Sequence, residues 1–469
     1  MRKTKIVCTI GPASESSQVL RKMIQEGMDV ARLNFSHGTI QEKIKIIRKI
    51  RSISKSLNQC VGVLADLGGP KFRLGKVEES TKLVKGKTVI LTAETKLGNA
   101  AELSINRPEL IAQLNVGDRV MISDGKLQLK VMQAGSRKVR CKVIIGGTLV
   151  DGKGLNMPDT KLNIPSMTKK DHADLKVCIQ EKVDFIGLSF VRSAEDVQLC
   201  RKILKKAKTD IFLIAKMEKA EAIENYKDII KAADGVMVAR GDLGIEVELD
   251  EVPLIQKKII GYANRSGKPV ITATEMLLSM VDSHRPTRAE ASDVANAIID
   301  GSDAIMLSEE TSIGQNPSLV VKIMAKIAST TEKNYKKIEK QKISKNKSKM
   351  LAYAVAGSTV ELAKDLEASL IISPTDSGDT PRRIVMFRPH QLVIALSTSQ
   401  RTLQKLSLSW GVVAWKIGKR ISVEKVLPTV RSRILKEKIG TSKEQVILCA
   451  GYPFGSKDNK GRIIQVETI

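Results

Sequence analysis

The feature that most constrains this chain is a repeated alternation of short apolar strands and amphipathic helices, interrupted once. In the first 67 residues, apolar runs at Lys5–Gly11, Asp29–Ser36 and Val61–Leu67 predict strands. Between them, Ser16–Gly27 and the isoleucine stripe of residues 44–53 have the spacing of amphipathic helices. Strands that are separated by helices in this way usually run parallel, in a sheet or a barrel.

The same alternation resumes at Pro165 and supplies five more strands, each preceded by a helical segment. Their sequences are DFIGLSF, IFLIAKME, GVMVARGDLG, PVITATEM and DAIMLSEE. Together with the first three they make eight, and residues 1–67 and 165–335 approach the ~250 residues typical of a (β/α)₈ barrel. The predicted fold class is therefore α/β, with a (β/α)₈ barrel at its centre.

Two further regions do not follow the barrel pattern. Residues 68–164 contain short alternating strands separated by Gly and Asp turns, which predicts a small β-barrel domain inserted after the third strand. Residues 336–349 are rich in lysine and are expected to form a basic linker. Residues 350–469 again alternate strands with helical segments, and we expect a C-terminal open α/β domain of regulatory type.

The charge and cysteine content limit the setting in which the chain works. The formal net charge is +27, which suits nucleic acid, an anionic surface or acidic small substrates, but a merely lysine-rich surface explains it equally well. No apolar run reaches the ~18 residues of a membrane span, and the basic N-terminus lacks a long apolar signal core. The six cysteines form no CxxC pair, which favours a reducing, cytoplasmic location.

Charged and polar residues gather where the predicted barrel strands end. In a (β/α)₈ barrel the active site lies at the carboxyl ends of the strands. The residues at or just after these ends are Arg32, Asn34, Ser36, His37, Asp66, Lys71, Arg73, Lys216, Glu218, Arg240, Gly241, Asp242, Thr274, Glu275, Ser308 and Glu310. Any one of them alone would pass as an ordinary loop residue, but charged groups at so many strand ends indicate a site.

The residue types at these ends point to phosphoryl chemistry. Glu218 and Asp242 end neighbouring strands, and two carboxylates at one point suit Mg²⁺, which completes its shell with substrate oxygens and water. Lys216 stands two residues before Glu218, on the same face of the strand. Arg32, Arg73 and Lys216 around a divalent ion favour an anionic group in transfer. No GxxxxGK[ST] loop or GxGxxG fingerprint is present, so a nucleotide would not be held by a P-loop.

At this point the sequence resembles a known family. The segments KTKIVCTIGPAS, ARLNFSHG, GPKFR, GLNMP, IAKMEK, VMVARGDLG, ITATEMLLSM and RPTRAEASDVANAIIDGSDAIMLSEET closely resemble pyruvate kinase. The resemblance covers Lys3 to about Glu332 and is weaker in the inserted and C-terminal domains. It implies phosphoryl transfer from phosphoenolpyruvate to ADP, the last step of glycolysis, under an inserted domain that closes as a lid.

The resemblance also implies roles for individual residues on the substrate side. Arg32 matches the arginine for the substrate phosphate, and Lys216 matches the lysine that stabilises the transferring phosphoryl group. Glu218 and Asp242 match the ligands of Mg²⁺ (or Mn²⁺). The residues that match the positions for the substrate carboxylate are Gly241, Asp242 and Thr274. Those that match the polar group near the enolate are Ser308 and Glu310, so the expected catalytic set is Lys216, Thr274, Ser308 and Glu310.

A second group is implied on the nucleotide and cation side. The expected nucleotide contacts are Asn34, His37, Arg73 and Lys153, although for His37 local packing is equally compatible with the sequence. The monovalent-cation shell would comprise Asn34, Ser36, Asp66 and the backbone of Leu67. Many family members carry glutamate at the position of Lys71; here its ammonium group is expected to replace the ion, so that K⁺ is not required.

The resemblance extends to assembly and regulation, and one alternative stays open. It implies a homotetramer, and a phosphorylated effector at the loop Thr375–Thr380, although a plain strand–helix turn fits that loop equally well. The alternative is a catalytically inactive basic barrel that binds nucleic acid or anionic surfaces. Only the net charge supports it, and the intact Lys216, Glu218, Asp242 and Thr274 argue against it. No membrane partner and no specific nucleic-acid partner are expected.

Overall fold

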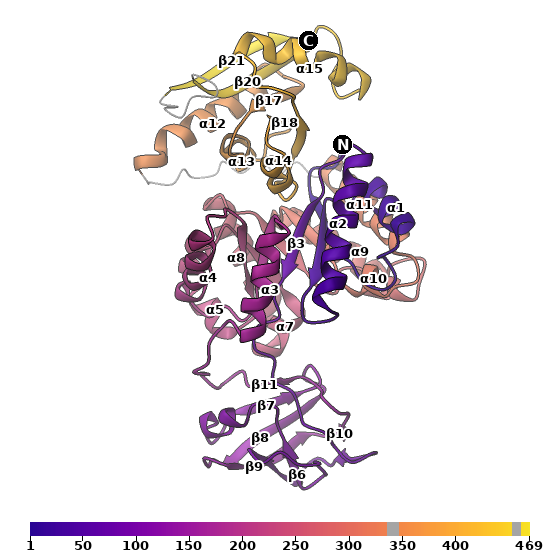
Figure 1. Cartoon of the computed structure of the whole chain (residues 1–469), viewed down its shortest axis with the longest axis vertical. Coiled ribbons are helices and arrows are strands. Elements are labelled where there is room, and N and C mark those ends of the chain that lie inside the picture. The colour runs from indigo at the N-terminus through magenta and orange to yellow at the C-terminus, as the bar shows by residue number, and fades with distance from the viewer. Residues whose placement is uncertain (335–346, 453–460) are drawn as a thin grey trace.

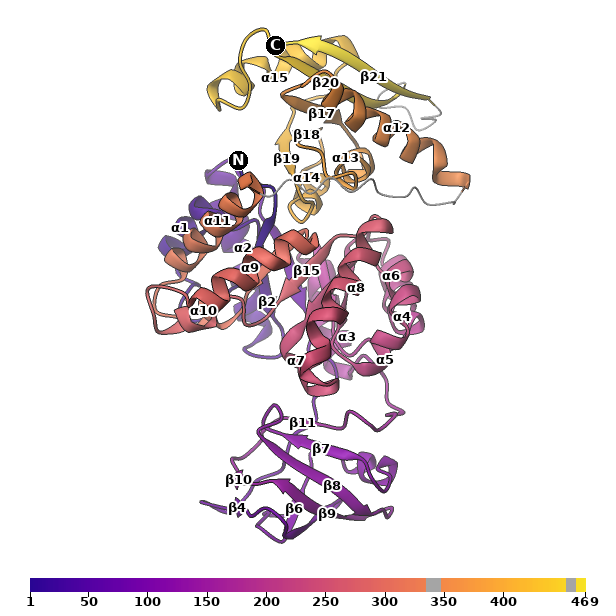
Figure 2. The same ribbon diagram turned by 180° about the vertical axis from the view of Figure 1, so that it is seen from behind.

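A computed structural model describes residues 1–334, 347–452 and 461–469, which form three domains stacked along one axis. The barrel occupies the middle, the inserted domain lies at one end and the C-terminal domain at the other (Figure 1). The reverse view shows the same order, with the chain passing between the barrel and the inserted domain through thin connections (Figure 2). The expected linker at 336–349 falls largely on residues outside those described, and from Lys347 onward the chain already belongs to α12.

The barrel is closed by eight parallel strands, which confirms the predicted fold class. The strands are β1 (Lys5–Thr9), β2 (Val30–Asn34), β3 (Gly62–Asp66), β12 (Phe185–Leu188), β13 (Phe212–Met217), β14 (Gly235–Ala239), β15 (Val270–Ala273) and β16 (Ala304–Leu307). The ring closes because β1 pairs with β16 on one side and with β2 on the other. Apolar side chains from the strands fill its interior, among them Val7, Leu64 and Ile271.

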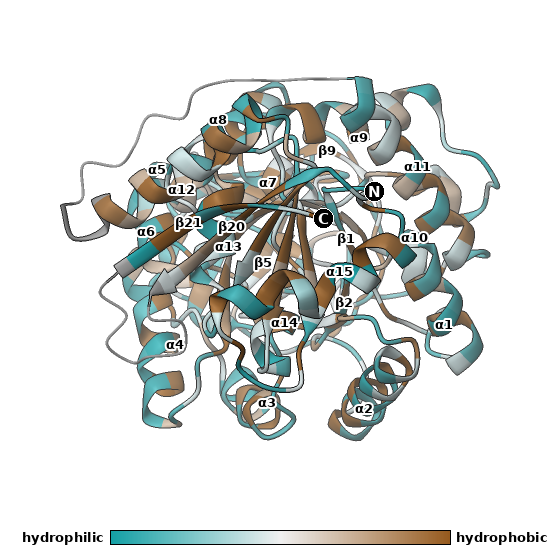
Figure 3. Cartoon of the chain, turned by 90° about the horizontal axis from the view of Figure 1, so that it is seen from above, coloured by the Kyte–Doolittle hydropathy of each residue, from teal (hydrophilic) through white to brown (hydrophobic). Residues whose placement is uncertain are grey.

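Helices surround these strands with their polar faces outward, as seen along the long axis in Figure 3. They are α1 (Ser17–Glu26), α2 (Ile40–Ser56), α3 (Lys169–Gln180), α4 (Ala194–Lys206), α5 (Ala220–Glu224), α6 (Tyr226–Ala232), α7 (Arg240–Glu246), α8 (Val252–Arg265), α9 (Arg288–Asp300), α10 (Glu309–Ser312) and α11 (Pro317–Asn334). Local signals fix several ends. Ser16 caps α1 by accepting from the Val19 amide, and Gly27 ends it in a left-handed conformation that glycine adopts without strain.

The inserted domain follows β3 and consists of short strands, as predicted. Its strands are β4 (Lys82–Leu83), β5 (Thr88–Thr92), β6 (Glu102–Ser104), β7 (Arg119–Ile122), β8 (Leu127–Gln133), β9 (Lys138–Ile145), β10 (Gly147–Thr148) and β11 (Leu155–Asn156). They pair as a six-stranded sheet, β11-β7-β8-β9-β5-β6, and a two-stranded sheet of β10 and β4. The expected small β-barrel is thus two sheets around a core of its own.

The C-terminal domain is an open five-stranded sheet with helices on its faces. Its elements are α12 (Lys347–Asp365), β17 (Leu370–Pro374), α13 (Asp379–Val385), β18 (Leu392–Ser397), α14 (Gln400–Leu406), β19 (Val412–Lys416), α15 (Val426–Lys436), β20 (Gln445–Tyr452) and β21 (Gly461–Thr468). The strand order is β19-β18-β17-β20-β21, and only β21 runs antiparallel to its neighbour. This is the open α/β architecture that the sequence predicts.

Polar contacts join the C-terminal domain to the end of the barrel where the strands begin. Arg388 donates to the Gly301 carbonyl at 2.6 Å and lies 3.2 Å from Asp303, just before β16. Lys5, at the start of β1, donates to the Val412 carbonyl at 2.8 Å. The opposite end, where the strands terminate, therefore faces the inserted domain. No helix in the described residues has the length and apolar composition needed to cross a membrane.

Candidate active site

Lys216 lies at the centre of the polar cluster where the barrel strands end. It sits near the end of β13, is 8% exposed, and donates to the Ser189 hydroxyl at 2.8 Å. Its Nζ lies 3.0 Å from Glu218 Oε2 and 3.5 Å from Asp66 Oδ1. Burial alone would lower the pKa of Lys216, but Asp66, Glu218 and Asp242 together raise it above its ordinary value. The side chain is therefore a fixed cation at neutral pH.

Arg32 forms a second fixed cation beside it. Its guanidinium donates to Asp66 Oδ2 from Nε at 2.8 Å and from Nη2 at 2.6 Å, so two charge-assisted bonds converge on one carboxylate oxygen. A third bond runs from Nη1 to the Thr9 hydroxyl at 2.8 Å. Burial would raise the pKa of Asp66, but Lys216 and Arg32 hold it below its usual range. Asp66 is thus an anion that orients two cations toward the same mouth of the barrel.

Glu218 and Asp242 are the carboxylates that the sequence assigns to a divalent metal. Glu218 is buried, and its Oε1 accepts from the Phe190 amide at 2.7 Å. Burial raises the pKa of Glu218; the Lys216 ammonium opposes this shift, and the nearby charge of Asp242 adds to it. Oε2 of Glu218 is buried but accepts no well-directed hydrogen bond. A hard cation suits this donor set, because it would use that oxygen and relieve the repulsion between the two acids.

The sequence Gly241-Asp242-Leu243-Gly244 predicts a tight turn after β14, and the structure differs from this prediction. Gly241 and Asp242 lie in the first turn of helix α7, so the turn continues as a helix. The Gly241 amide donates to the Thr274 hydroxyl at 2.8 Å, which joins the ends of β14 and β15. Thr274 and Glu275 both have positive φ, 69° and 54°. Such backbone strain in a β-branched residue is rare and concentrates at functional sites.

Ser308 and Glu310 follow β16, but only one of them has a free polar atom. The Ser308 hydroxyl is buried and has no hydrogen-bond partner. Glu310 is fully buried, and its carboxylate accepts from the Ser308 amide at 2.6 Å and the Leu277 amide at 3.0 Å. Burial raises the pKa of Glu310. Glu310 therefore joins the end of β16 to the loop after β15, while Ser308 keeps an unused hydroxyl.

The residues of the expected cation shell lie together at the ends of β2 and β3, where Asn34 pairs in register with Asp66. Their oxygens are largely engaged within the protein. Asn34 Oδ1 accepts from the Ser36 amide at 2.9 Å, and the Leu67 carbonyl accepts from the Ser189 hydroxyl at 2.7 Å.

The nucleotide-side residues come from both the barrel and the inserted domain. His37 is exposed, and its pKa is lowered by partial burial and by the nearby cations Lys71 and Arg73. Arg73 donates to the Gly152 carbonyl at 2.7 Å, which places it beside the exposed Lys153 of the inserted domain. Lys71 lies close enough to Asp66 and Asp242 for their charges to act on it. These residues form a basic rim around the mouth.

Several residues that hold the site together were not predicted from the sequence. Ser189 bonds both Lys216 and Leu67, and Thr9 bonds Arg32. Ser189 carries a usable signal, because it is a polar residue near the end of the fourth predicted strand, DFIGLSF. Arg240 was noticed at a strand end, but its role is structural: it donates to the Thr274 carbonyl at 2.7 Å and to Asp293 at 2.8 Å.

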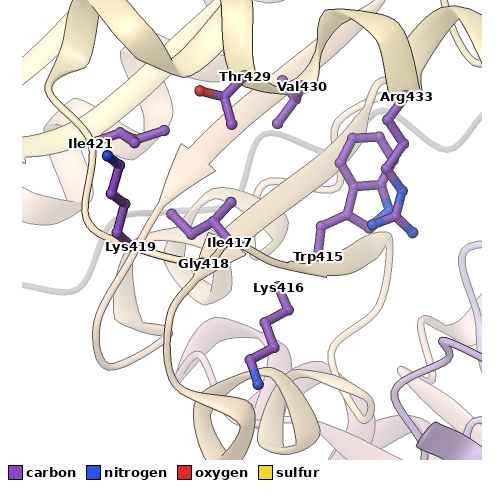
Figure 4. Close-up of a pocket in the computed structure, with 9 residues that line it drawn as sticks. All are labelled: Trp415, Lys416, Ile417, Gly418, Lys419, Ile421, Thr429, Val430 and Arg433. Atoms are coloured by element: carbon purple, nitrogen blue, oxygen red, sulfur yellow. The ribbon is translucent and has the colours of Figure 1, made fainter.

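The C-terminal domain carries two separate hollows. One, of about 560 Å³, lies between the end of β19 and α15, where Arg433 stacks on the Trp415 ring at 4.2 Å (Figure 4). The other, of about 200 Å³, includes the loop Thr375–Thr380 that was predicted to bind an effector. Both belong to the domain at the opposite end of the barrel from the strand-end cluster.

Comparison with known proteins identifies the family of this chain. Residues 1–321 match the family model "Pyruvate kinase, barrel domain", and residues 353–464 match "Pyruvate kinase, alpha/beta domain". A pyruvate kinase of Thermococcus litoralis is 40% identical over 99% of this chain and 98% of its own length. One from Staphylococcus epidermidis is 41% identical over 97% of this chain and 79% of its own length. A crystal structure of a Cryptosporidium parvum pyruvate kinase covers all of this chain and 96% of its own, with 34% identity and a TM-score of 0.93. The chain belongs to the pyruvate kinase family.

Proposed function

We propose that this protein transfers a phosphoryl group from phosphoenolpyruvate to ADP, giving pyruvate and ATP. The observation that carries the proposal is the contact of Lys216 with Glu218 and Asp66 at the strand ends. A buried cation between acids cannot be explained as surface charge. A transferring phosphoryl group carries developing negative charge, and a preorganised cation stabilises it without reorganisation.

Each substrate end has matching groups in the mouth of the barrel. Arg32, which is oriented by Asp66, would bind the phosphate of phosphoenolpyruvate. Lys216 would stay in contact with the phosphoryl group during its transfer. The Gly241 amide and the Thr274 hydroxyl already bond each other, so they mark where a carboxylate would insert between them. These fixed positions hold the substrate in one orientation, which lowers the entropic cost of the reaction.

Glu218 and Asp242 would hold Mg²⁺, or Mn²⁺ in its place. The ion supplies charge neutralisation at the phosphoryl oxygens. Oε2 of Glu218 accepts no well-directed hydrogen bond and has only the Lys216 ammonium beside it, and this, with the mutual repulsion of the two acids, supports the assignment. Asp242 lies exposed in the mouth, where substrate oxygens and water would complete an octahedral shell.

Ser308 and Glu310 are proposed to divide the work at the enolate. The Ser308 hydroxyl is unpartnered and would relay a proton to the methylene carbon of the enolate, taking the replacement proton from water. Both Glu310 oxygens accept backbone N–H groups, which favours a positioning role over direct proton donation. The expectation that Glu310 itself acts on the substrate stays a prediction.

The nucleotide would lie between the barrel and the inserted domain. Asn34 and His37 belong to the barrel, whereas Arg73 and Lys153 belong to the inserted domain, where Arg73 donates to the Gly152 carbonyl. Closure of that domain over two polyanions would bring Lys153 toward the phosphates and exclude water that competes for the phosphoryl group.

Three finer features are proposed on family membership together with particular residues. Lys71 replaces the function of a monovalent cation at the shell of Asn34, Ser36, Asp66 and Leu67. The loop Thr375–Thr380 binds a phosphorylated effector, since its two aspartates are paired with Arg382 and Arg420. The enzyme works in the cytoplasm. It assembles as a homotetramer, and light scattering at micromolar concentration would test this assembly.

A coupled assay of pyruvate formation tests the main proposal. The wild-type protein should produce pyruvate from phosphoenolpyruvate and ADP only with Mg²⁺ or Mn²⁺. Asp242→Asn should lose at least 100-fold in kcat, because removing one preorganised charge costs ~2.7–4 kcal/mol. Asp250→Asn, a matched change at an exposed acid outside the cluster, should keep its rate. Wild-type turnover in Asp242→Asn would refute the metal assignment, and an inactive wild type would restore the alternative of a basic binding protein.

A further inference from the structure

We propose that Phe190 is a positioning residue that couples the inserted domain to the metal ligand Glu218. Phe190 belongs to the loop after β12, so it is part of the barrel by sequence. Its backbone bonds the proposed ligand, whereas its ring belongs to the core of the other domain. The inference rests on the proposed function, because it takes Glu218 to hold a divalent metal.

The backbone of Phe190 is fixed in an unusual conformation. Its φ is 60°, which is strained for a residue with a side chain, and such strain persists only where the surroundings enforce it. In this conformation its amide donates to Glu218 Oε1 at 2.7 Å. The bond is buried at both ends, since Phe190 is 7% and Glu218 is 8% exposed. A small rotation of this peptide would therefore displace or release the carboxylate.

The ring of Phe190 is held from the side of the inserted domain. Phe72, in the first crossing between the domains, packs edge-on against it with ring centroids 5.6 Å apart and planes at 87°. Two cations from the barrel complete its surroundings: Lys219 Nζ lies 5.1 Å and the Arg192 guanidinium 5.3 Å from the ring centroid. Edge-to-face pairs and cation–π contacts both require defined geometry, so the ring must follow Phe72.

The same loop also holds the second crossing of the chain. Arg192 donates to the Ile164 carbonyl at 2.6 Å and also bonds the Leu162 carbonyl, where the inserted domain returns to the barrel. Phe190 and Arg192 therefore contact both connections, as expected of a pivot. A change in the angle of the inserted domain would reach this loop through Phe72 and through Ile164.

A further ion pair ties the neighbouring barrel elements into the same unit. Lys219, next to Glu218, lies 2.6 Å from Glu246 at the end of α7, and both are buried. Glu246 also accepts from Asn156 of β11 in the inserted domain at 3.0 Å. Asp242 lies in the first turn of the same helix, α7. Both proposed metal ligands are therefore connected to the inserted domain, Glu218 through Phe190 and Asp242 through Glu246. The affinity for the metal should therefore depend on the orientation of the inserted domain relative to the barrel.

Mn²⁺ binding, measured by electron paramagnetic resonance on the full-length protein without substrates, tests this coupling. Phe190→Leu keeps an apolar side chain but removes the ring, and it should weaken Mn²⁺ binding about tenfold, the lower end of the effect usual for groups that orient metal ligands. Phe72→Leu leaves the Phe190 amide untouched and should act in the same direction. Since both act through one contact, the double variant should bind no more weakly than the weaker-binding single variant.

A substitution in the core of the inserted domain, away from Phe190 and Phe72, distinguishes the coupling between that domain and the metal site from a general loss of stability. Val131→Ala creates a cavity on β8 in the inserted domain and should lower the thermal midpoint without altering Mn²⁺ affinity. Wild-type Mn²⁺ affinity in Phe190→Leu and Phe72→Leu would overturn the inference, as would an equal loss in Val131→Ala or additive losses in the double variant. Glu218→Gln tests the proposed function separately. If this variant binds Mn²⁺ like the wild type, Glu218 is not a metal ligand and the proposed metal site is refuted.

Discussion

The ammonium group of Lys216 lies 3.0 Å from the Glu218 carboxylate, and both side chains are buried. In most proteins such a pair would be a costly structural element, because two charges must be removed from water. Here Glu218 keeps one oxygen without a well-directed hydrogen bond, and Asp66 shares the same cation. The pair is therefore arranged for a further anion and cation to enter, which is what phosphoryl transfer requires.

Lys216→Ala should lower kcat at least 100-fold while the KM for phosphoenolpyruvate changes about threefold or less. The reason is that the cation contributes most when charge develops on the moving group, so its loss affects the transition state more than the ground state. Steady-state kinetics in the coupled assay measure both constants. A mutant that loses affinity but keeps kcat would assign Lys216 to binding alone. Circular dichroism should be recorded in parallel, because removal of one partner leaves Glu218 and Asp66 buried with less compensation.

The strand ends could be predicted from the sequence because each follows an apolar run of clear length. The cap at Ser16 and the glycine at Gly27 likewise place α1 from local chemistry alone. The segment Gly241–Gly244 was predicted as a turn because glycine disfavours helix interiors. In the structure it continues as α7, whose Leu243 and Glu246 are buried, so tertiary burial outweighs the local preference.

What the sequence could not supply is the pairing of residues that are distant along the chain. The hydrogen bond from Lys216 to Ser189 depends on β12 and β13 lying side by side, and the packing of Phe190 on Phe72 depends on how two domains meet. The sequence around these four residues contains no local signal for either contact. Likewise, the sequence placed Glu310 at a strand end, but only the fold shows that backbone amides engage both of its oxygens.

Thr274→Gly should separate backbone strain from the function of the hydroxyl. Glycine adopts a φ of 69° readily, so the free energy of unfolding should stay within ~1 kcal/mol of the wild type. The hydroxyl that accepts from the Gly241 amide would be lost. Because this hydroxyl is proposed to bond the substrate carboxylate, a charged group, kcat/KM for phosphoenolpyruvate should fall at least tenfold. Thr274→Ser keeps the hydroxyl and should retain most of the activity. Denaturant unfolding and steady-state kinetics measure the two effects, and an unchanged kcat/KM in the glycine variant would contradict the assignment.

The pKa of His37 should lie below 6.5 in the free enzyme and rise when ADP binds. Partial burial and the cations Lys71 and Arg73 disfavour the imidazolium, whereas a nearby polyphosphate would favour it. Because the folded-state pKa is depressed, protonation favours the unfolded chain, and the contribution to stability is lost as the pH falls below about 6.5. Proton NMR titration can follow this ring among four histidines, with His37→Gln for assignment. A pKa that does not move with ADP would place the nucleotide elsewhere.

The loop Thr375–Thr380 should respond to a phosphorylated monosaccharide or to AMP more than to a sugar bisphosphate. The loop joins β17 to α13, and Thr375, Ser377 and Thr380 are among the residues that line a cavity of about 200 Å³. Asp376 and Asp379 limit how much negative charge the loop accepts, although arginines pair with both. Titration of each compound against the apparent affinity for phosphoenolpyruvate measures the effect, with Thr375→Val as the binding-deficient variant. If no compound shifts that affinity, the loop is a plain strand–helix connection.

The last prediction concerns K⁺ and Lys71. Burial and the nearby cations Arg73 and Lys216 lower the pKa of Lys71, while Asp242 and Asp66 oppose that shift. At a few Å and an effective dielectric near 20, a unit charge is worth ~4 kcal/mol, comparable to what a bound monovalent ion would supply. The wild-type enzyme should therefore keep nearly its full rate in Tris or Na⁺ buffer without K⁺.

Lys71→Glu should reverse this behaviour, because the carboxylate would remove the fixed cation and supply a ligand for K⁺. Its activity without K⁺ should fall more than about tenfold, a barrier increase of ~1.4 kcal/mol. Addition of K⁺ should restore it. Lys76→Glu makes the same charge change at an exposed lysine in the inserted domain and should create no K⁺ dependence. A wild-type rate that itself rises more than about tenfold with K⁺ would show that Lys71 points to solvent and that Asn34, Ser36, Asp66 and Leu67 still bind the ion.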